Sequence, residues 1–260
     1  MGGAAPGGQP HWPLSPAEQR LLDAADRLSA AIEGQLTAAQ PPELHRAAEP
    51  ALIGAFHAVR AVRCLRAATL TSRAGYAVEA APIVRSLLED AVSLRYLSAR
   101  PTHRVRKWLR FDEQRSLEYW KLIERLGLDL QKSDHIRHLE QASHPSGSPV
   151  WWSNKTPSAM ARELRDTDPD LVQTFKAFYP WLSDVAHANV KTTSNYYFAE
   201  EGAEPELRVG PSDHLLHLML ELATALAVRI CFIARELGTG MDPGPIAEAH
   251  RDFEVALGEG

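Results

Sequence analysis

Only two cysteines, Cys64 and Cys231, occur among the 260 residues, and no Cys-x-x-Cys pair is present. A disulfide scaffold and a cysteine-rich zinc site are therefore excluded, and both thiols are expected to be reduced and buried in a cytoplasmic protein. The sequence also lacks a glycine-rich phosphate loop of the P-loop or dinucleotide type and a Gly-x-Ser-x-Gly elbow. The corresponding nucleotide-binding and hydrolase chemistries are not expected.

A long uninterrupted apolar run is missing too. The longest apolar stretch, Leu215 to Ile233, contains His217, Glu221 and Arg229, which a membrane-spanning helix rarely tolerates. It is predicted to be a core helix, and no membrane association is expected. Residues 1–10 are rich in Gly, Pro and Ala and lack the basic start and apolar segment of a secretory signal. Residues 1–14 are therefore expected to form a disordered tail.

Net positive charge is absent as well, since the chain carries -5 at pH 7. This balance argues against binding duplex DNA over the whole surface. One short span is nevertheless basic, with only Asp112 and Glu113 as acids; it contains Arg95, Arg100, Arg104, Arg106, Lys107, Arg110 and Arg115. Either these side chains lie over apolar neighbours and pair with acids, or they line a local positively charged groove.

Helical signals run through most of the chain and predict an all-α fold. Ser15, Pro16 and Glu18 form a capping box with proline at the first helical position, followed by leucines at helical spacing. Thr156-Pro157 and Asp168-Pro169 are likewise expected to be a cap followed by proline at the first helical position, and Thr102 is the expected cap of the helix after Pro101. The same reasoning predicts a kinked bundle of about eight helices, including Pro16 to Thr37, Glu49 to Thr71, Pro82 to Leu97, Thr102 to Leu126, Asp129 to Gln141, a short helix after Thr156, Asp170 to Val190 and Ser212 to Leu237.

Three further segments complete the predicted organisation. Residues 15–237 are expected to form a single helical domain, and residues 238–260 a weakly structured C-terminal tail containing a weak acidic helix. The segments Tyr196 to Phe198 and Glu206 to Val209 flank an acidic turn and are the candidate strands of one small β-hairpin. Trp151 and Trp152 lie in a loop rich in Pro, Gly and Ser, where they either pack onto the bundle or cover a ligand.

A polar column interrupts one of the apolar helices. Tyr179, Ser183 and His187 are spaced by four residues and share one helical stripe, with Asp184 beside His187. Because an unsatisfied buried hydroxyl or imidazole costs on the order of 1–3 kcal/mol, the column must line a cavity or join a polar network.

The helix after Pro82 offers the partners for that column. Arg85 and Glu89 are also four residues apart and interrupt an apolar run. They either form an ion pair that fixes helix register, or they belong to a site in which Arg85 binds an anion and His187 is the acid/base group. In the second interpretation, Trp151, Trp152 and Asn189 line the ligand pocket.

Two segments carry a resemblance to a known family. Ala81-Pro-Ile-Val-Arg85-Ser-Leu-Leu-Glu89 and Tyr179-Pro-Trp-Leu-Ser183-Asp-Val-Ala-His187 resemble a bacterial helical family known as domain-of-unknown-function family 5677. The resemblance implies a helical bundle that shares these polar positions, and it implies no established reaction. The family is distantly similar to HEPN-type nucleotide-binding and ribonuclease bundles. Those bundles place arginine and histidine on one helix, whereas here the two residues come from separate helices.

The sequence therefore favours a small-ligand or nucleotide/RNA-handling protein without a predicted cofactor, and a homodimer is a fair default. The residues expected to contact or act on the ligand are Arg85, Glu89, Tyr179, Ser183 and His187. One alternative is an oxidase or hydrolase that uses iron, manganese or zinc, with Asp184, His187 and Glu89 as ligands and with His214, His217, Asp213 and Glu221 nearby in sequence. A non-catalytic interaction protein is the other alternative.

Overall fold

The computed structural model describes residues 14–39, 49–128, 130–141, 153, 155–187, 189, 195–198, 206–207 and 212–258. These residues form nine α-helices, a short 3-10 helix and a two-stranded hairpin, so the all-α prediction is confirmed. Trp151 and Trp152, predicted to line the pocket, lie outside the described residues.

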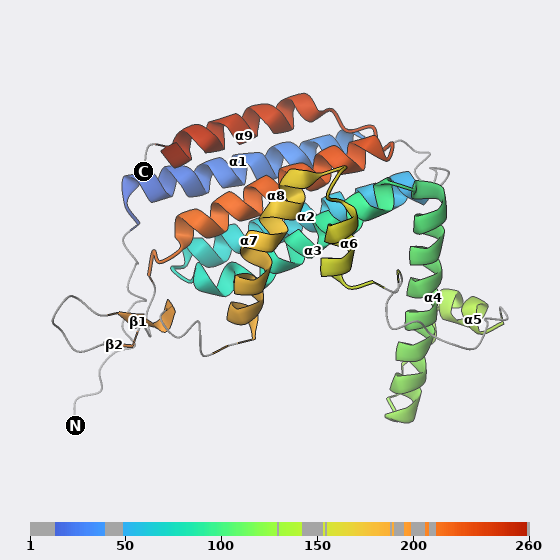
Figure 1. Ribbon diagram of the computed structural model, residues 1–260. Helices are drawn as coiled ribbons and strands as arrows, with labels where there is room; N and C mark the ends of the chain where they lie inside the picture. Colours follow the sequence, from blue (N-terminus) through green and yellow to red (C-terminus); the bar gives the residue numbers. More distant parts are fainter. Residues whose placement is uncertain are drawn as a thin grey trace, which may run out of the picture.

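Five long helices make the body of the bundle (Figure 1). They are α1 (Pro16–Ala38), α2 (Glu49–Arg73), α3 (Ala81–Ser98), α8 (Leu216–Glu236) and α9 (Pro243–Gly258). The apolar helix α8 is central, because it packs against α1, α2, α3 and α9. Fully buried leucines from three helices meet in the core, among them Leu21, Leu65 and Leu87.

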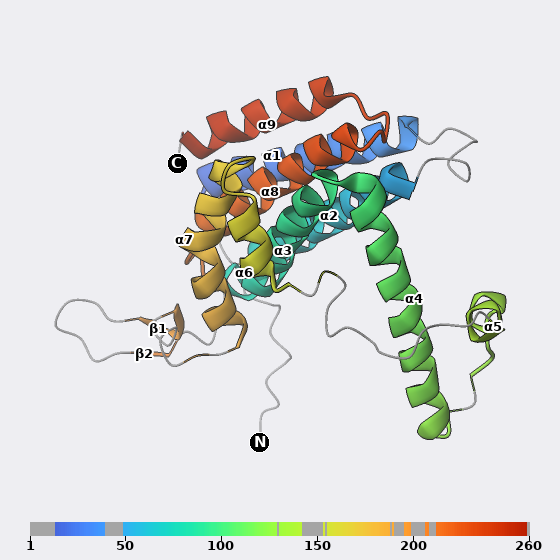
Figure 2. The ribbon, with the colours of Figure 1, turned by 45° about the vertical axis from the view of Figure 1, so that its right-hand side comes forward.

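Two helices cross the body, and two others leave it. The helices α6 (Pro157–Glu163) and α7 (Pro169–Ala186) pack against α3. The long helix α4 (Pro101–Arg125) projects from the bundle and carries the short α5 (Asp134–Gln141) on its outer side, as both ribbon views show (Figure 2). The sequence of α4 is strongly amphipathic, but Val105 is its only buried residue. Much of the apolar side of α4 therefore stays partly exposed.

The predicted caps account for the starts of three helices, α1, α6 and α7. The Ser15 hydroxyl accepts the Glu18 N–H at 3.2 Å, and the Glu18 carboxylate accepts the Ser15 N–H at 2.6 Å. Thr156 and Asp168 cap α6 and α7. The prediction that Thr102 caps α4 is wrong. That helix starts at Pro101, and its N-cap residue, Arg100, makes no side-chain capping hydrogen bond.

The predicted C-terminal tail needs correction. Gly238 ends α8 with a left-handed φ of 93°, as a C-terminal glycine often does. The terminal helix predicted over Pro245 to Leu257 is present as α9, but it is a packed helix over residues 243–258 and not part of a weakly structured tail. Ile246 and Phe253 are almost fully buried, and α9 packs along α1, so apolar side chains at helical spacing explain why the segment is ordered.

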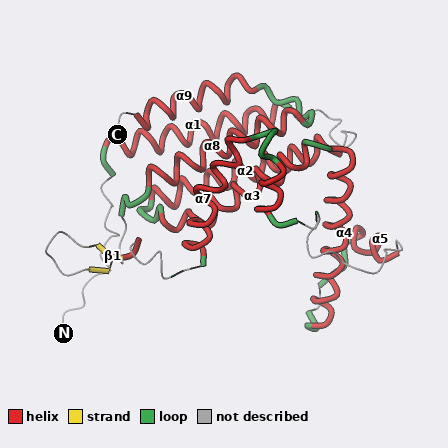
Figure 3. Tube along the Cα trace, viewed as in Figure 1, coloured by secondary structure: helices red, strands yellow, loops and turns green. Residues whose placement is uncertain are grey.

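The hairpin is present at its predicted place. Strand β1 (Tyr197–Phe198) pairs antiparallel with β2 (Glu206–Leu207), and the tube view shows the pair beside the helical body (Figure 3). Among the described residues, one helix, α8, is long and apolar enough to cross a membrane by length and composition alone. Of its most apolar window, 67% is buried inside the structure, as in the core helix of a soluble protein.

A buried carboxylate fixes the start of α7 on the body. Asp168 is 7% exposed and accepts the Leu171 N–H at 3.2 Å, which is its predicted capping role. The same carboxylate pairs with Arg229 of α8 and with Arg95 of α3, whose Nε lies 3.3 Å away. Two helices of the body therefore hold the N-terminus of α7, and this anchoring directs the C-terminal end of α7 towards the first turns of α3.

Candidate functional site

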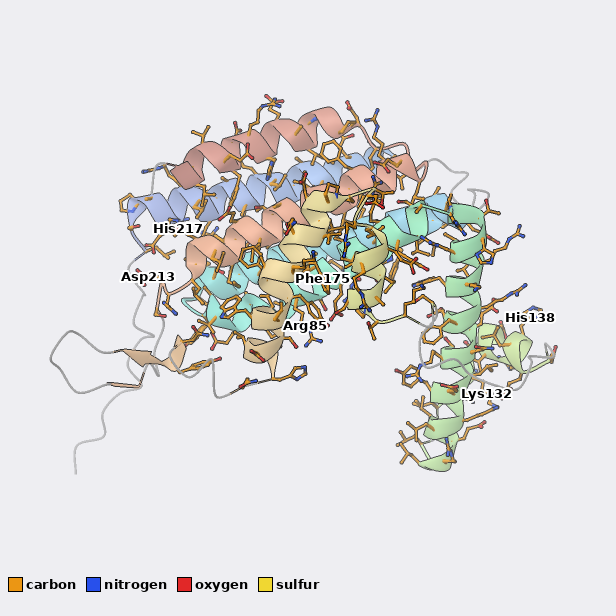
Figure 4. All side chains as sticks on the ribbon, viewed as in Figure 1. Arg85, Lys132, His138, Phe175, Asp213 and His217 are labelled. Atoms are coloured by element: carbon orange, nitrogen blue, oxygen red, sulfur yellow. The ribbon has the colours of Figure 1, made fainter. Side chains whose placement is uncertain are left out.

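The polar residues predicted on two separate helices meet where α7 crosses α3. Arg85 and Glu89 lie one turn apart on α3, Tyr179 lies just past the middle of α7, and His187 is the C-cap residue of α7. Figure 4 shows Arg85 beside α7. These four residues, Arg85, Glu89, Tyr179 and His187, are called the Arg85 cluster below.

The Arg85 guanidinium is the centre of the cluster because each of its nitrogens has a partner. Its Nε donates to Glu89 Oε1 at 3.1 Å, and one Nη donates to the Tyr179 hydroxyl at 3.4 Å. The other Nη lies 2.9 Å from Nε2 of His187. The Tyr179 hydroxyl in turn donates to Glu89 Oε1 at 3.0 Å, which closes the network.

This geometry determines the tautomer of His187. Arginine nitrogens only donate, so Nε2 of His187 must accept and the ring proton must reside on Nδ1. A neutral imidazole that accepts from a guanidinium has its own lone pair directed at the charged group. A second proton on His187 would place two cations in contact, and the direct contact would then have to open unless an anion came between them.

Local burial favours a phenol at Tyr179 and a charged Arg85. Partial burial and the nearby Glu89 carboxylate raise the pKa of Tyr179, so its hydroxyl keeps the proton that it donates. Burial alone would lower the pKa of Arg85, but the hydrogen bonds to Tyr179 and Glu89 outweigh it and raise that pKa. The cluster therefore combines a permanent cation, one carboxylate and a neutral imidazole.

Packing holds the cluster from the side of α7. The Tyr179 ring stacks on buried Phe175 with ring centroids 4.3 Å apart, and the Arg85 guanidinium lies 5.4 Å from the centre of the Tyr179 ring. The backbone N–H of His187 donates to the Ser183 carbonyl, so the last turn of α7 fixes the backbone position of His187. The His187 side is exposed while the Tyr179 side is half-buried, which leaves one open side for a ligand.

Ser183 and Asn189 lie close in sequence but outside this network. Within the part of the chain that the structure describes, the Ser183 hydroxyl makes no hydrogen bond to the Arg85 cluster. Asn189 instead donates its side-chain amide to Asp184 Oδ1 at 2.9 Å, just after the end of α7. The predicted ligand roles of Ser183 and Asn189 stay predictions.

The metal interpretation finds little geometric support. Asp184 is engaged by Asn189 and does not join His187 and Glu89, and no group of three or more potential ligands gathers among the described residues. His214 lies 3.4 Å from the side-chain oxygen of Asn195. Figure 4 places Asp213 and His217 at the start of α8 and His138 on α5, away from Arg85.

Sequence reasoning missed a second polar group, on the side of α3 that faces α2. Arg60 of α2 donates to Asp90 of α3 at 2.5 Å and to the Ser86 hydroxyl at 3.3 Å. Beside them, His57 is buried with its Nδ1 3.7 Å from Asp90, too far for a hydrogen bond. The sequence signal was available, because His57 lies on the apolar stripe of α2 where a histidine needs a partner.

Both cysteines are free thiols and Cys231 is buried, as predicted, but the prediction that Cys64 is buried too is wrong. Cys64 is half-buried at the edge of an open hollow of about 530 Å³ between α2 and α3, and burial raises the pKa of its thiol. Burial raises the pKa of Cys231 to about 12. Neither environment favours a thiolate nucleophile.

Comparison with known proteins bears on the family and leaves the reaction open. No curated protein and no solved structure matches the chain, so the resemblance to HEPN-type bundles stays a prediction. A family model matches residues 51–205, a range that includes Arg85 and Glu89 on α3 as well as Tyr179 and His187 at the end of α7. The chain therefore belongs to the family that this model describes, the family of unknown function DUF5677.

Proposed function

We propose that this protein handles a nucleotide or RNA and binds an anionic phosphate group at the Arg85 cluster. The observation that carries the proposal is the 2.9 Å approach of an Arg85 Nη to His187 Nε2 on the exposed side of the cluster. An arginine and a histidine held together at the surface by half-buried partners are suited to an oxyanion, because both can donate to it.

The donor count of Arg85 leaves room for a ligand. A guanidinium has five N–H bonds, and Glu89, Tyr179 and His187 take three of them. One N–H on each Nη is left for a phosphate oxygen, which is the arrangement that arginine uses in bidentate recognition. Glu89 balances the charge of Arg85, so affinity depends on directed hydrogen bonds more than on net charge.

His187 would change its role when the ligand binds. In the free protein it accepts from Arg85, but a bound phosphate can accept from Arg85 and from a protonated His187 together. Binding is therefore expected to be accompanied by uptake of a proton. The same exchange makes His187 the group that would transfer a proton to or from a bound ligand.

Calorimetric titration of the full chain with adenosine monophosphate tests this proposal. Arg85→Ala is expected to weaken binding at least about tenfold, since a charge-assisted hydrogen bond contributes ~1.5–3 kcal/mol. Arg85→Lys should restore only part of the loss, because lysine cannot bind bidentately. His187→Ala should abolish the proton uptake, measured in two buffers of different ionisation enthalpy.

Arg66→Ala is the matched control, because Arg66 is a surface arginine of α2 that pairs with Glu33. It should bind the nucleotide like the wild type. Failure of the wild-type protein to bind, or unchanged binding by a folded Arg85→Ala variant, would contradict the proposed function.

A further inference from the structure

A basic pocket lies where the end of α3 meets α4 and α6. Its cavity volume is about 240 Å³, and Tyr96 of α3 forms part of its wall. The charged side chains around it are Arg100, His103, Arg104, Lys107, Lys155 and Glu163. Four permanent cations therefore face one carboxylate, an excess of three positive charges on a chain whose net charge is -5.

The single acid is already engaged by two of the cations. Glu163 pairs with Lys155 and lies 3.6 Å from Arg104. The Arg104 guanidinium also lies 3.5 Å from the centre of the Tyr96 ring and donates to the Tyr96 carbonyl, so it is fixed in place. Arg104 and Lys155 therefore form part of the pocket wall. Because Glu163 is engaged by these two cations, it does not pair with the other described cations of the pocket.

The remaining cations are without an acid. Among the residues that the structure describes, the side chains of Arg100, His103 and Lys107 have no ion-pair or hydrogen-bond partner, and all three are exposed. They lie one turn apart along the first two turns of α4. That helix begins here without a side-chain cap and without an acid in its first turn, so its dipole adds to the positive potential.

The register of α3 relates this pocket to the Arg85 cluster. Tyr96 lies eleven positions after Arg85, which is close to three full helical turns. Both residues therefore lie on the same face of α3, the face against which α6 and α7 pack. Eleven residues correspond to about 16 Å along the helix axis.

We propose that the basic pocket is a second phosphate site and that the ligand is a single-stranded polynucleotide. Because α6 and α7 cover the face of α3 between the two sites, the strand would pass over the outer sides of α7 and α6 from the Arg85 cluster to α4. A mononucleotide cannot reach two sites that are about 16 Å apart along the axis of α3, whereas a strand of several nucleotides can. This inference rests on the proposed function and names its ligand class. Because the chain as a whole carries a net charge of -5, such a strand should bind at these two basic sites and not over the rest of the surface.

Fluorescence anisotropy with labelled oligouridylates tests the length dependence. The double variant Arg100→Ala/Lys107→Ala is expected to weaken binding of the octamer at least about tenfold and to leave the mononucleotide unaffected. Because each lost phosphate contact reduces the slope of log K against log salt by about 0.7 for a single strand, the slope should fall by about 1.4. Octamers of RNA and DNA should both show the loss, since the contacts are to phosphates.

The double variant Arg66→Ala/Arg251→Ala removes the same charge from α2 and α9 and serves as the control. Equal loss in both double variants, an octamer that binds no tighter than the mononucleotide, or equally tight binding of an acidic peptide would overturn the inference. These outcomes leave the Arg85 dependence of mononucleotide binding intact, so they are distinct from failure of the proposed function.

Discussion

Nε2 of His187 lies 2.9 Å from an Nη of Arg85, although the two residues are 102 positions apart in the chain. The contact joins the C-cap of α7 to the first turns of α3. It depends on three supports: the Glu89 carboxylate, the Tyr179 hydroxyl and the anchoring of α7 through Asp168. Each support can be removed separately, and the expected consequences differ.

Tyr179→Phe removes one hydroxyl and keeps the ring that stacks on Phe175. Arg85 loses an acceptor and Glu89 loses a donor, so the unfolding free energy is expected to fall by about 1 kcal/mol. Nucleotide affinity should fall by a few-fold, because Arg85 remains but is less well oriented. Calorimetry and urea denaturation measure the two effects, and an unchanged affinity would show that the hydroxyl does not position Arg85.

Asp168 is expected to stabilise the fold through two separable effects. Asp168→Asn keeps a capping side chain but leaves Arg229 without its carboxylate and Arg95 with Glu236 alone, and we expect a loss of about 1–3 kcal/mol, since both arginines are partly exposed. Asp168→Ala should lose about 1 kcal/mol more with the cap. Urea denaturation at pH 7 compares the variants, and Ala and Asn variants as stable as the wild type would refute this role.

His57 predicts a specific dependence of stability on pH. Burial, helped by the charge of Arg60, lowers the pKa of His57 from 6.5 to about 4 in the folded protein. Between pH 6.5 and 4, His57 is therefore protonated in the unfolded chain and neutral in the folded chain. The free energy of unfolding then decreases as the pH falls from about 6.5 towards 4, by on the order of 3 kcal/mol.

His57→Leu should remove this loss, while stability at pH 7 is kept because the buried ring nitrogens lack hydrogen bonds to described residues. Burial raises the pKa of Asp90, which acts in the opposite sense at the acid end and is common to both proteins. The control is His138→Leu, an exposed position on α5. Parallel stability curves for wild type and His57→Leu between pH 4 and 6.5 would contradict the assignment.

Two helical glycines should respond to alanine with opposite signs. A Cβ at Gly54 would lie 3.0–3.2 Å from Thr239 and the Ala234 backbone, where α2 approaches the end of α8. Gly54→Ala is therefore expected to destabilise by about 1–3 kcal/mol through overpacking. A Cβ at Gly34 would meet no atom within 4 Å, so Gly34→Ala should stabilise α1 by about 0.5–1 kcal/mol. Thermal unfolding distinguishes the two, and equal shifts would contradict the close approach.

Local chemistry predicted the helices and half of the cluster. The Ser15 capping box and the prolines after Thr156 and Asp168 set helix starts, and spacing by four placed Tyr179 near His187 and Arg85 near Glu89. The requirement that buried polar groups find partners then predicted that the two pairs meet. Each of these arguments uses residues within a few turns of one another.

Features that depend on distant packing were out of reach. Asp168 was predicted as a cap, but its pairing with Arg95 and Arg229 needs α3 and α8 to be in place. Helix α9 is ordered because it packs along α1 and buries Phe253, and this packing joins the two ends of the chain. Ser183 lies on the predicted stripe, and still its hydroxyl makes no hydrogen bond to the described residues of the cluster, because the place on the stripe does not determine the rotamer.

The central claim is that Arg85 and His187 act together on one anionic ligand, and a double-mutant cycle on nucleotide affinity tests it most directly. The wild type, Arg85→Ala, His187→Ala and the double variant are titrated with adenosine monophosphate. We expect each single change to weaken binding and the double change to cost less than their sum, with a coupling of about 1 kcal/mol or more. Affinities of all four folded proteins that are equal to one another would contradict the claim.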